Sequence, residues 1–97
     1  MIRLLEAAEL ELDEARDYYN TLSPNLGDAF ILEVVSALER IEHYPNAWQE
    51  LTSEIRRYRL PRFPYGIIYA HEDGDILVLA VAHLHRQPEY WMDRIKK

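Results

Sequence analysis

Apolar side chains in the first half of the chain recur at spacings of three and four residues, the period of a helix that buries one face. The two stripes are Ala8, Leu12, Ala15, Tyr19 and Leu22, then Leu26, Phe30, Val34, Leu38 and Ile41. Ser23 and Pro24 lie between them, which predicts that Ser23 caps the second helix and Pro24 takes its first position. Pro45 ends that helix. Before the first helix, residues 2–5 are either a short strand or a lead-in.

The second half has the period and composition of strands. The predicted strands are residues 55–60, 65–71 and 76–82. Asp73 and Gly74 form a dipeptide that favours a tight hairpin turn between the last two strands. The last strand is seven consecutive apolar residues, which indicates that both of its faces are covered.

Pro88 is expected to open a short terminal helix. This helix would carry Tyr90, Trp91, Arg94 and Ile95. The predicted fold class is therefore α+β, with an N-terminal helical hairpin packed on one face of a small antiparallel sheet and a short C-terminal helix.

Composition narrows the class of protein. The 97 residues predict one domain over residues 1–97, and 48% hydrophobic with 29% charged residues is typical of a globular protein. The chain has no cysteine, which excludes disulfides and thiolate metal sites. Its N-terminus is too acidic for a signal peptide, and no segment approaches the roughly 20 apolar residues of a membrane span. We therefore expect a cytoplasmic protein with no membrane partner and no cofactor.

Charge is distributed unevenly along the chain. The net charge is −6, but residues 1–55 carry −9 and residues 56–97 carry +3. Four arginines lie within seven positions: Arg56, Arg57, Arg59 and Arg62. The cluster is either a binding surface for an anionic partner or a solvated strand edge that discourages sheet pairing. The overall acidity argues against broad, nonspecific nucleic-acid binding.

An ordered set of residues along nearly the whole chain resembles a known family. The set is Ala15, Tyr18, Tyr19, Leu26, Gly27, Phe30, Pro45, Asn46, Ala47, Trp48, Arg56, Arg57, Phe63, Pro64, Tyr65, Tyr69, Ala80, Val81, His83, Arg86, Pro88, Tyr90 and Trp91. It resembles the RelE/ParE superfamily, the toxin halves of type II toxin–antitoxin systems, and most of all the ParE-like, plasmid-stabilisation branch. The resemblance implies a toxin that a cognate antitoxin silences by wrapping it with a C-terminal segment.

The resemblance leaves two modes of action, because RelE-like members cleave messenger RNA in the ribosome and ParE-like members poison DNA gyrase. A metal-independent endoribonuclease would use cationic side chains and proton carriers. The candidates are Arg57, Arg59, His83, His85, Arg86 and Tyr90. Ribonuclease members typically place an arginine where this chain has Gly66, and glycine cannot stabilise phosphate charge. We therefore favour the ParE-like mode, with the ribonuclease and a non-toxic antitoxin-binding module as alternatives.

The expected binding residues come mostly from the basic half of the chain. They are Arg56, Arg57, Arg59, Arg62, Arg86, Tyr90 and Trp91. We expect the antitoxin to bind the arginine-rich strand and the groove between the helical hairpin and the sheet, and Tyr90 to be an exposed aromatic that a partner can contact. No helix-turn-helix signature is present, so no direct sequence-specific DNA binding is expected.

Other candidate residues have plainer interpretations. His83 and His85 have the i, i+2 spacing of half a metal site, but no third ligand is suggested nearby, so no metal is expected. Trp48 and Trp91 are expected to anchor loops against the helices. The acidic side chains of the first helix are expected to serve solubility; they are Glu9, Glu11, Asp13, Glu14 and Asp17.

Overall fold

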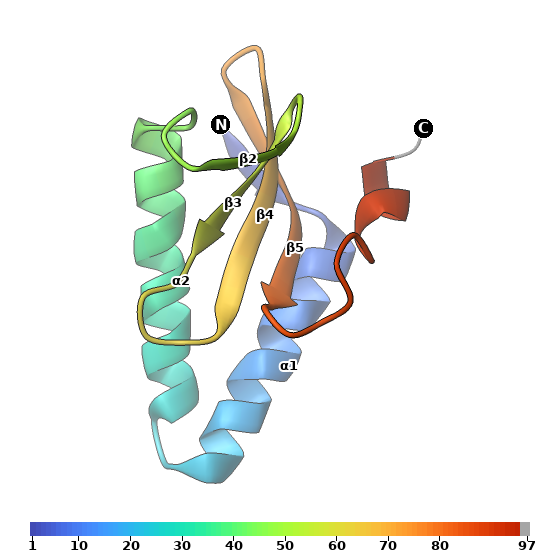
Figure 1. The fold of residues 1–97 in the computed structure, drawn as a ribbon. Coiled ribbons are helices and arrows are strands. Elements are labelled where there is room, and N and C mark those ends of the chain that lie inside the picture. Colours follow the sequence, from blue (N-terminus) through green and yellow to red (C-terminus); the bar gives the residue numbers. More distant parts are fainter. Residues whose placement is uncertain (96–97) are drawn as a thin grey trace.

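The computed structural model describes residues 1–95, which fold into a five-stranded mixed sheet with two helices on one face (Figure 1). The elements in chain order are β1 (Ile2–Leu4), α1 (Glu6–Leu22), α2 (Leu26–His43), β2 (Gln49–Thr52), β3 (Ile55–Arg59), β4 (Tyr65–Glu72), β5 (Asp75–His83) and the 3-10 turn η1 (Met92–Ile95). The α+β class and the helical hairpin on one sheet face are confirmed, but a strand precedes the hairpin. No helix in this described range is long and apolar enough to cross a membrane.

The sheet has the order β1-β5-β4-β3-β2, and it is mixed, not wholly antiparallel as predicted, because β1 runs parallel to β5. The other neighbouring strands are antiparallel. Residues 2–5 thus contain a short strand, β1, which lies beside β5. Asp73 and Gly74 both have positive φ angles, 54° and 81°, which suits the predicted tight turn. β2 was not predicted, because its sequence Gln-Glu-Leu-Thr has a single large apolar residue and is recognisable only from its pairing with β3.

The loop between the helices corrects the predicted cap of α2. Ser23 closes α1 instead, since its backbone N–H donates to the carbonyl oxygen of Tyr19 at 3.2 Å. Asn25 adopts a left-handed conformation, with φ of 70°, and α2 begins only at Leu26. The donor at the start of α2 is satisfied from the other helix: the Gly27 N–H bonds Asn20 Oδ1 at 2.7 Å. The short loop brings the helices so close that α1 provides the cap.

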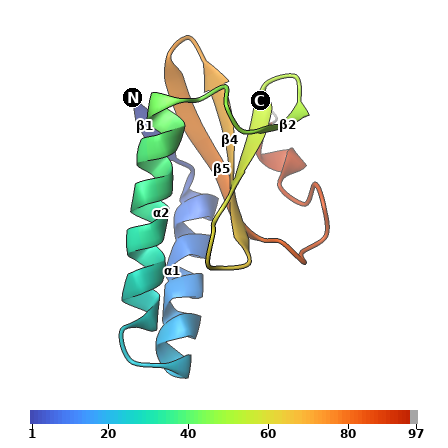
Figure 2. The same ribbon diagram turned by 60° about the vertical axis from the view of Figure 1, so that its left-hand side comes forward.

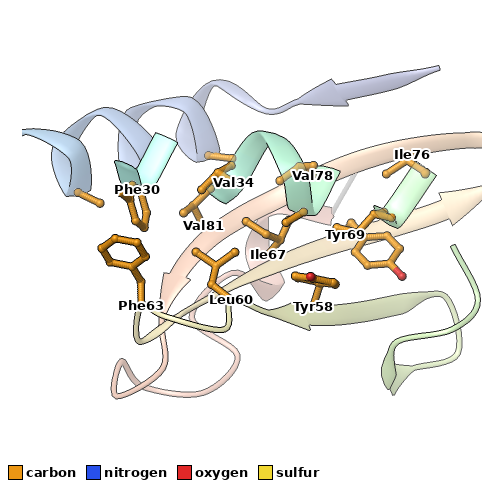
Figure 3. Packing of buried hydrophobic residues seen from close by; sticks show 14 of the residues in the cluster. Phe30, Val34, Tyr58, Leu60, Phe63, Ile67, Tyr69, Ile76, Val78 and Val81 are labelled. Atoms are coloured by element: carbon orange, nitrogen blue, oxygen red, sulfur yellow. The ribbon is translucent and has the colours of Figure 1, made fainter. Parts of the chain in front are cut away.

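The main core lies between the helices and the sheet (Figure 3). Phe30 of α2 meets Phe63, which follows β3, with ring centroids 5.1 Å apart and planes at 86°. Tyr19 of α1 joins the same cluster at 4.9 Å from Phe63. Edge-to-face contacts of this kind add stability beyond the buried area. We call the side of the sheet that faces this core the helix-facing side.

A smaller cluster covers the opposite, outer side of the sheet, where the C-terminal segment lies (Figure 2). Its buried members are Ile55, Ile68, Leu79, Ala80, Ala82 and Trp91. Trp91 is only 5% exposed and so anchors the C-terminal segment to the sheet, not to the helices as predicted. Trp48 does join the helix-facing core, edge-on to Tyr58 at 4.7 Å.

The predicted terminal helix is shorter than expected. Helical structure in the described C-terminal segment is limited to the 3-10 turn at Met92–Ile95, which leaves Pro88, Tyr90 and Trp91 outside it. Glu89 has a left-handed backbone with φ of 71°, so a helix that starts at Pro88 is interrupted one residue later. This kink directs Trp91 onto the outer sheet face.

Tyr69 provides a test of the packing around the start of β2. Its hydroxyl is buried and donates to the Pro45 carbonyl at 2.6 Å. Burial raises the pKa of Tyr69 to about 12, although Arg56 partly opposes this shift. Because the folded chain holds this proton more tightly than the unfolded chain, the stabilisation is complete below pH 10 and is lost as the pH rises towards 12.

We expect Tyr69→Phe to lower the free energy of unfolding by about 1–2 kcal/mol at neutral pH, since it leaves the Pro45 carbonyl without its donor. The variant should also lose stability less steeply between pH 10 and 12 than the wild type. Urea unfolding at a series of pH values measures both effects. If the variant loses stability as steeply as the wild type between pH 10 and 12, the loss of stability at alkaline pH comes from other tyrosines.

Candidate binding surface

The arginine-rich strand does not present its arginines on one surface. Ile55 belongs to the outer cluster and Tyr58 to the helix-facing core, so alternate residues of β3 point to opposite sides. Arg57 and Arg59 therefore lie on the outer side, and Arg56 lies on the helix-facing side. Arg57 and Arg59 thus share one face of the strand.

Arg56 and Arg62 are held by contacts within the chain. Arg56 Nη1 donates to the carbonyl oxygen of Trp48 at 2.8 Å and so fixes the loop before β2. The backbone N–H and Nε of Arg62 both donate to the carboxylate of Glu33 on α2, at 2.9 and 3.0 Å. These contacts tie loops to the rest of the fold.

Arg57 and Arg59 form the basic part of the outer side. The stem of Arg57 lies across Gly66 of β4, where an added Cβ would be 3.1 Å from Arg57 Cγ and Cδ. Arg57 Nη2 donates to Gln49 Oε1 at 2.8 Å, but its buried Nε has no partner within residues 1–95. Burial and the neighbouring Arg59 both lower the pKa of Arg57. The local field therefore favours an anion.

A shallow pocket of about 280 Å³ lies beside these two arginines. Its lining residues are Trp48, Gln49, Arg57, Tyr58 and Arg59. β2 reaches only as far as the Gln49–Arg57 pair, so the β3 edge next to Arg59 is not covered by it. An exposed guanidinium beside a partly buried one can bind a carboxylate or a phosphate. We call Arg57 and Arg59 the arginine pair.

Arg86 and Tyr90 follow β5 and lie beside α1, in a second cluster. Arg86 and Arg94 flank the ring of Tyr90, with their Cζ atoms 4.0 and 5.0 Å from its centroid. The Tyr90 hydroxyl donates to Glu11 at 2.8 Å, and burial together with this bond raises its pKa. Tyr90 is therefore half-buried and bonded within the chain, not the exposed aromatic that the sequence suggested.

Glu11 is the centre of this second cluster and was not predicted. Its carboxylate, 11% exposed, accepts bonds from both terminal nitrogens of Arg94 at 3.0 and 2.8 Å. It also accepts the backbone N–H of Val81 at 2.9 Å, and Arg86 lies 3.8 Å away. The expectation that Glu11 serves solubility is wrong. The sequence does indicate that Glu11 is partly buried, because it lies three residues after Ala8 and four before Ala15 and so belongs to the apolar face of the helix.

The structure divides the ribonuclease candidates into two groups. One group lies together around a shallow pocket and consists of His83, His85, Arg86 and Tyr90, and the arginine pair lies apart from it. His83 packs on Tyr65 at 5.1 Å between ring centroids, and Tyr65 belongs to the helix-facing core, whereas the arginine pair is on the outer side. The ring of His85 lies 5.2 Å from that of His83, and its backbone N–H donates to His83 Nδ1 at 3.1 Å. No group of three or more histidine, aspartate or glutamate side chains in the described part of the chain is arranged to hold a metal ion.

Comparison with known proteins finds matches over most of the chain. Residues 2–88 match the family described as the ParE toxin of the type II toxin–antitoxin system, parDE. Toxin ParE2 of Mycobacterium tuberculosis, from strains CDC 1551 / Oshkosh and H37Rv, is 33% identical over 88 residues, which is 90% of this chain and 84% of the relative.

A chain of the chromosomal ParDE TA system from P. aeruginosa has a similar solved structure. Its TM-score is 0.75 at 17% sequence identity, over 87% of this chain and 95% of that chain. This likeness shows a shared fold: two helices on one face of a mixed sheet.

Proposed function

The chain belongs to the ParE toxin family and is a toxin of a type II toxin–antitoxin system, and on that premise we propose that it stops growth by binding DNA gyrase, without catalysis, until a cognate antitoxin neutralises it. The observation that carries the proposal is the family match over residues 2–88. In this proposal, residues 1–97 act as one toxin domain in the cytoplasm.

Two features of the site support binding over RNA cleavage. At Gly66, where ribonuclease members typically carry an arginine, the space above the backbone is filled by the stem of Arg57. Arg86 lines the same shallow pocket as His83, but it lies 3.8 Å from the carboxylate of Glu11, which competes with a phosphate. The imidazole of His83 and the arginine pair lie on opposite sides of the sheet, so this proton carrier and these two phosphate-binding groups do not meet. General acid–base catalysis requires both within hydrogen-bond reach of the same phosphate.

The antitoxin contact in this proposal has two parts. One is the arginine pair, which offers exposed positive charge to an acidic segment. The other is a surface groove of about 390 Å³ between α2 and the segment after β3. It is lined by Ala29, Leu32, Glu33, Ser36, Arg40, Pro61 and Arg62. An extended or helical antitoxin tail would cover the apolar Leu32, which is 70% exposed.

The mode of action is tested by inducing the chain alone in bacteria and following DNA and protein synthesis by separate pulse labels. We expect DNA synthesis to fail first and the cells to become filamentous. If protein synthesis stops first, the chain acts as a ribonuclease. If neither falters while the chain accumulates in folded form, it is an antitoxin-binding module without toxicity.

The role of the arginine pair predicts a loss of antitoxin affinity in the double variant Arg57→Ala/Arg59→Ala. We expect an increase in Kd of about tenfold to a hundredfold, because charge-assisted contacts to an acidic segment are lost. Isothermal titration calorimetry with the purified cognate antitoxin measures it. Arg56 is left unchanged, because its bond to the Trp48 carbonyl supports the fold.

Arg16→Ala is the matched control for this experiment. Arg16 lies on α1 and pairs with Asp13 and Asp17, at 3.3 and 3.2 Å. Its removal changes the net charge by one unit without touching the arginine pair. If the double variant and the wild type bind the antitoxin with equal affinity, β3 is not part of the antitoxin contact.

A further inference from the structure

Arg57 uses only one arm of a two-armed hydrogen-bonding group. The Nε and Nη2 N–H groups of an arginine lie on the same edge of the guanidinium, so together they fit the two oxygens of one carboxylate. In Arg57, Nη2 donates to Gln49 Oε1 at 2.8 Å, whereas Nε is buried and has no acceptor within residues 1–95. Arg57 also forms no ion pair within that range. We call its Nε and Nη2 groups the Arg57 fork.

The amide of Gln49 leaves the fork incomplete. Its one oxygen is bonded to Nη2, and its other polar group is an NH₂, which donates and cannot accept the Nε–H. A carboxylate in the same place has two acceptor oxygens and satisfies both arms. The structure contains such a two-oxygen contact elsewhere: two nitrogens of Arg94 donate to the two oxygens of Glu11, at 3.0 and 2.8 Å.

The pocket beside the fork is short of acceptors. Two buried side-chain nitrogens in residues 1–95 have no hydrogen-bond partner, Trp48 Nε1 and Arg57 Nε, and both residues line the pocket of about 280 Å³ at the end of β2. Indole and guanidinium N–H groups can only donate, and buried donors in folded proteins are nearly always bonded. Arg59 lines the same pocket and adds positive charge. This combination selects an anionic ligand.

We propose that Gln49 is a placeholder in a carboxylate site, and that an aspartate or glutamate side chain of the cognate antitoxin displaces it and binds both arms of the Arg57 fork. The proposal rests on the proposed function, because it takes the antitoxin as the partner. Gln49 is exposed at the first position of β2, so its side chain can turn away while the strand stays paired. A carboxylate is favoured over a phosphate dianion, since the chain itself carries a net charge of −6.

The fork is also held ready for its ligand. The stem of Arg57 lies against Gly66, where even a Cβ would be 3.1 Å from Cγ and Cδ. A side chain fixed in this way loses little conformational freedom when a ligand binds. The position of the guanidinium thus depends on the stem and not on the bond to Gln49, which can be exchanged for another acceptor.

Gln49→Glu tests the proposal, because it places a carboxylate of the chain itself on the fork. We expect the Kd for the purified cognate antitoxin to rise about tenfold or more in isothermal titration calorimetry. Gln49→Ala empties the fork and should bind at least as tightly as the wild type. Thr52→Glu adds the same charge at an exposed position of β2 and should change the Kd by less than about threefold.

Two results of the titration would overturn the placeholder role. If Gln49→Ala weakens binding as much as Gln49→Glu does, Gln49 itself contacts the antitoxin. If Thr52→Glu weakens binding as much as Gln49→Glu does, the loss is general charge repulsion and not occupation of the fork.

Nuclear magnetic resonance of the arginine Nε–H groups tests the site without the antitoxin. Arg57→Lys identifies the Arg57 signal by its disappearance. We expect this signal to move downfield in Gln49→Glu, and in the wild type when sodium acetate is added, but not with sodium chloride at the same ionic strength. If neither shift occurs, the fork is not a carboxylate site, whatever the pulse labels show about the toxin's mode of action. A larger shift with sodium phosphate than with acetate would contradict the choice of anion.

The same signal then identifies the source of the carboxylate. In the complex of the wild type with the antitoxin, the Arg57 Nε–H should show the downfield shift that it has in Gln49→Glu. If acetate shifts the signal and the antitoxin does not, the site binds carboxylates but the antitoxin is not its partner. That result would overturn the proposal and leave the neutralisation of the toxin by its antitoxin intact.

Discussion

Replacing Gly27 with alanine is expected to lower the free energy of unfolding by about 2–4 kcal/mol, although alanine is the better helix former. An added Cβ would overlap the backbone oxygen of Arg16 and lie 2.7 Å from Cγ of Asn20. The helices must then separate, and the bond from the Gly27 N–H to Asn20 Oδ1 is lost as well. For a domain of this size, thermal unfolding should shift down by about 10–25 °C.

Two further variants separate the loss of the Asn20 cap from the steric cost of an added Cβ. Asn20→Ala removes only the cap and should cost about 1 kcal/mol. Gly66→Ala adds a Cβ 3.1 Å from the stem of Arg57, which can move aside, so it should cost less than about 1 kcal/mol. If Gly27→Ala is as stable as Gly66→Ala, the close approach of α1 and α2 is not rigid.

The parts of the fold that the sequence predicted are those with a strong local signal. The two apolar stripes place both helices because a helix that packs on a sheet must bury one face. The apolar run of β5 predicts a strand covered on both sides, and the main core and the outer cluster do cover it. Asp73 and Gly74 favour the left-handed turn that the hairpin adopts.

The missed parts depend on contacts between distant residues. The cap of α2 comes from Asn20 in another helix, and no local rule connects Asn20 with Gly27. β2 is a strand because it pairs with β3, not because of its own composition. Trp91 was assigned to the wrong face of the sheet, since the backbone of Glu89 determines the direction of the C-terminal segment.

The candidate surface shows the same limit. Strand alternation is a local rule, and it is sufficient to put Arg57 and Arg59 on one side of β3. The partners of Arg62 and Tyr90 are Glu33 and Glu11, which are 29 and 79 residues away in the sequence. The way in which a charged side chain is held depends on such distant contacts, which composition alone does not predict.

Glu11→Ala is expected to have the largest effect of any single change in the second cluster, a loss of about 3–5 kcal/mol in the free energy of unfolding. The guanidinium of Arg94, 20% exposed, would lose its carboxylate, and the Val81 N–H would lose its acceptor. The pKa of Arg94 is raised chiefly by its hydrogen bond to Glu11. When Glu11 is removed, the guanidinium stays charged, because arginine is not deprotonated in proteins, and its partly buried charge is left without a partner. Urea denaturation monitored by circular dichroism measures the loss.

Two other glutamate variants decide whether charge or hydrogen bonding causes the loss. Glu11→Gln keeps an acceptor for Val81 but no charge, so it should retain part of the stability because the backbone N–H stays bonded. Glu14→Ala removes an exposed carboxylate from the same helix and should change stability by less than about 0.5 kcal/mol. If Glu11→Ala matches Glu14→Ala, the cluster contributes nothing to the fold. If Glu11→Gln matches Glu11→Ala, the ion pair with Arg94 accounts for the whole effect, since the bond to Val81 alone stabilises nothing.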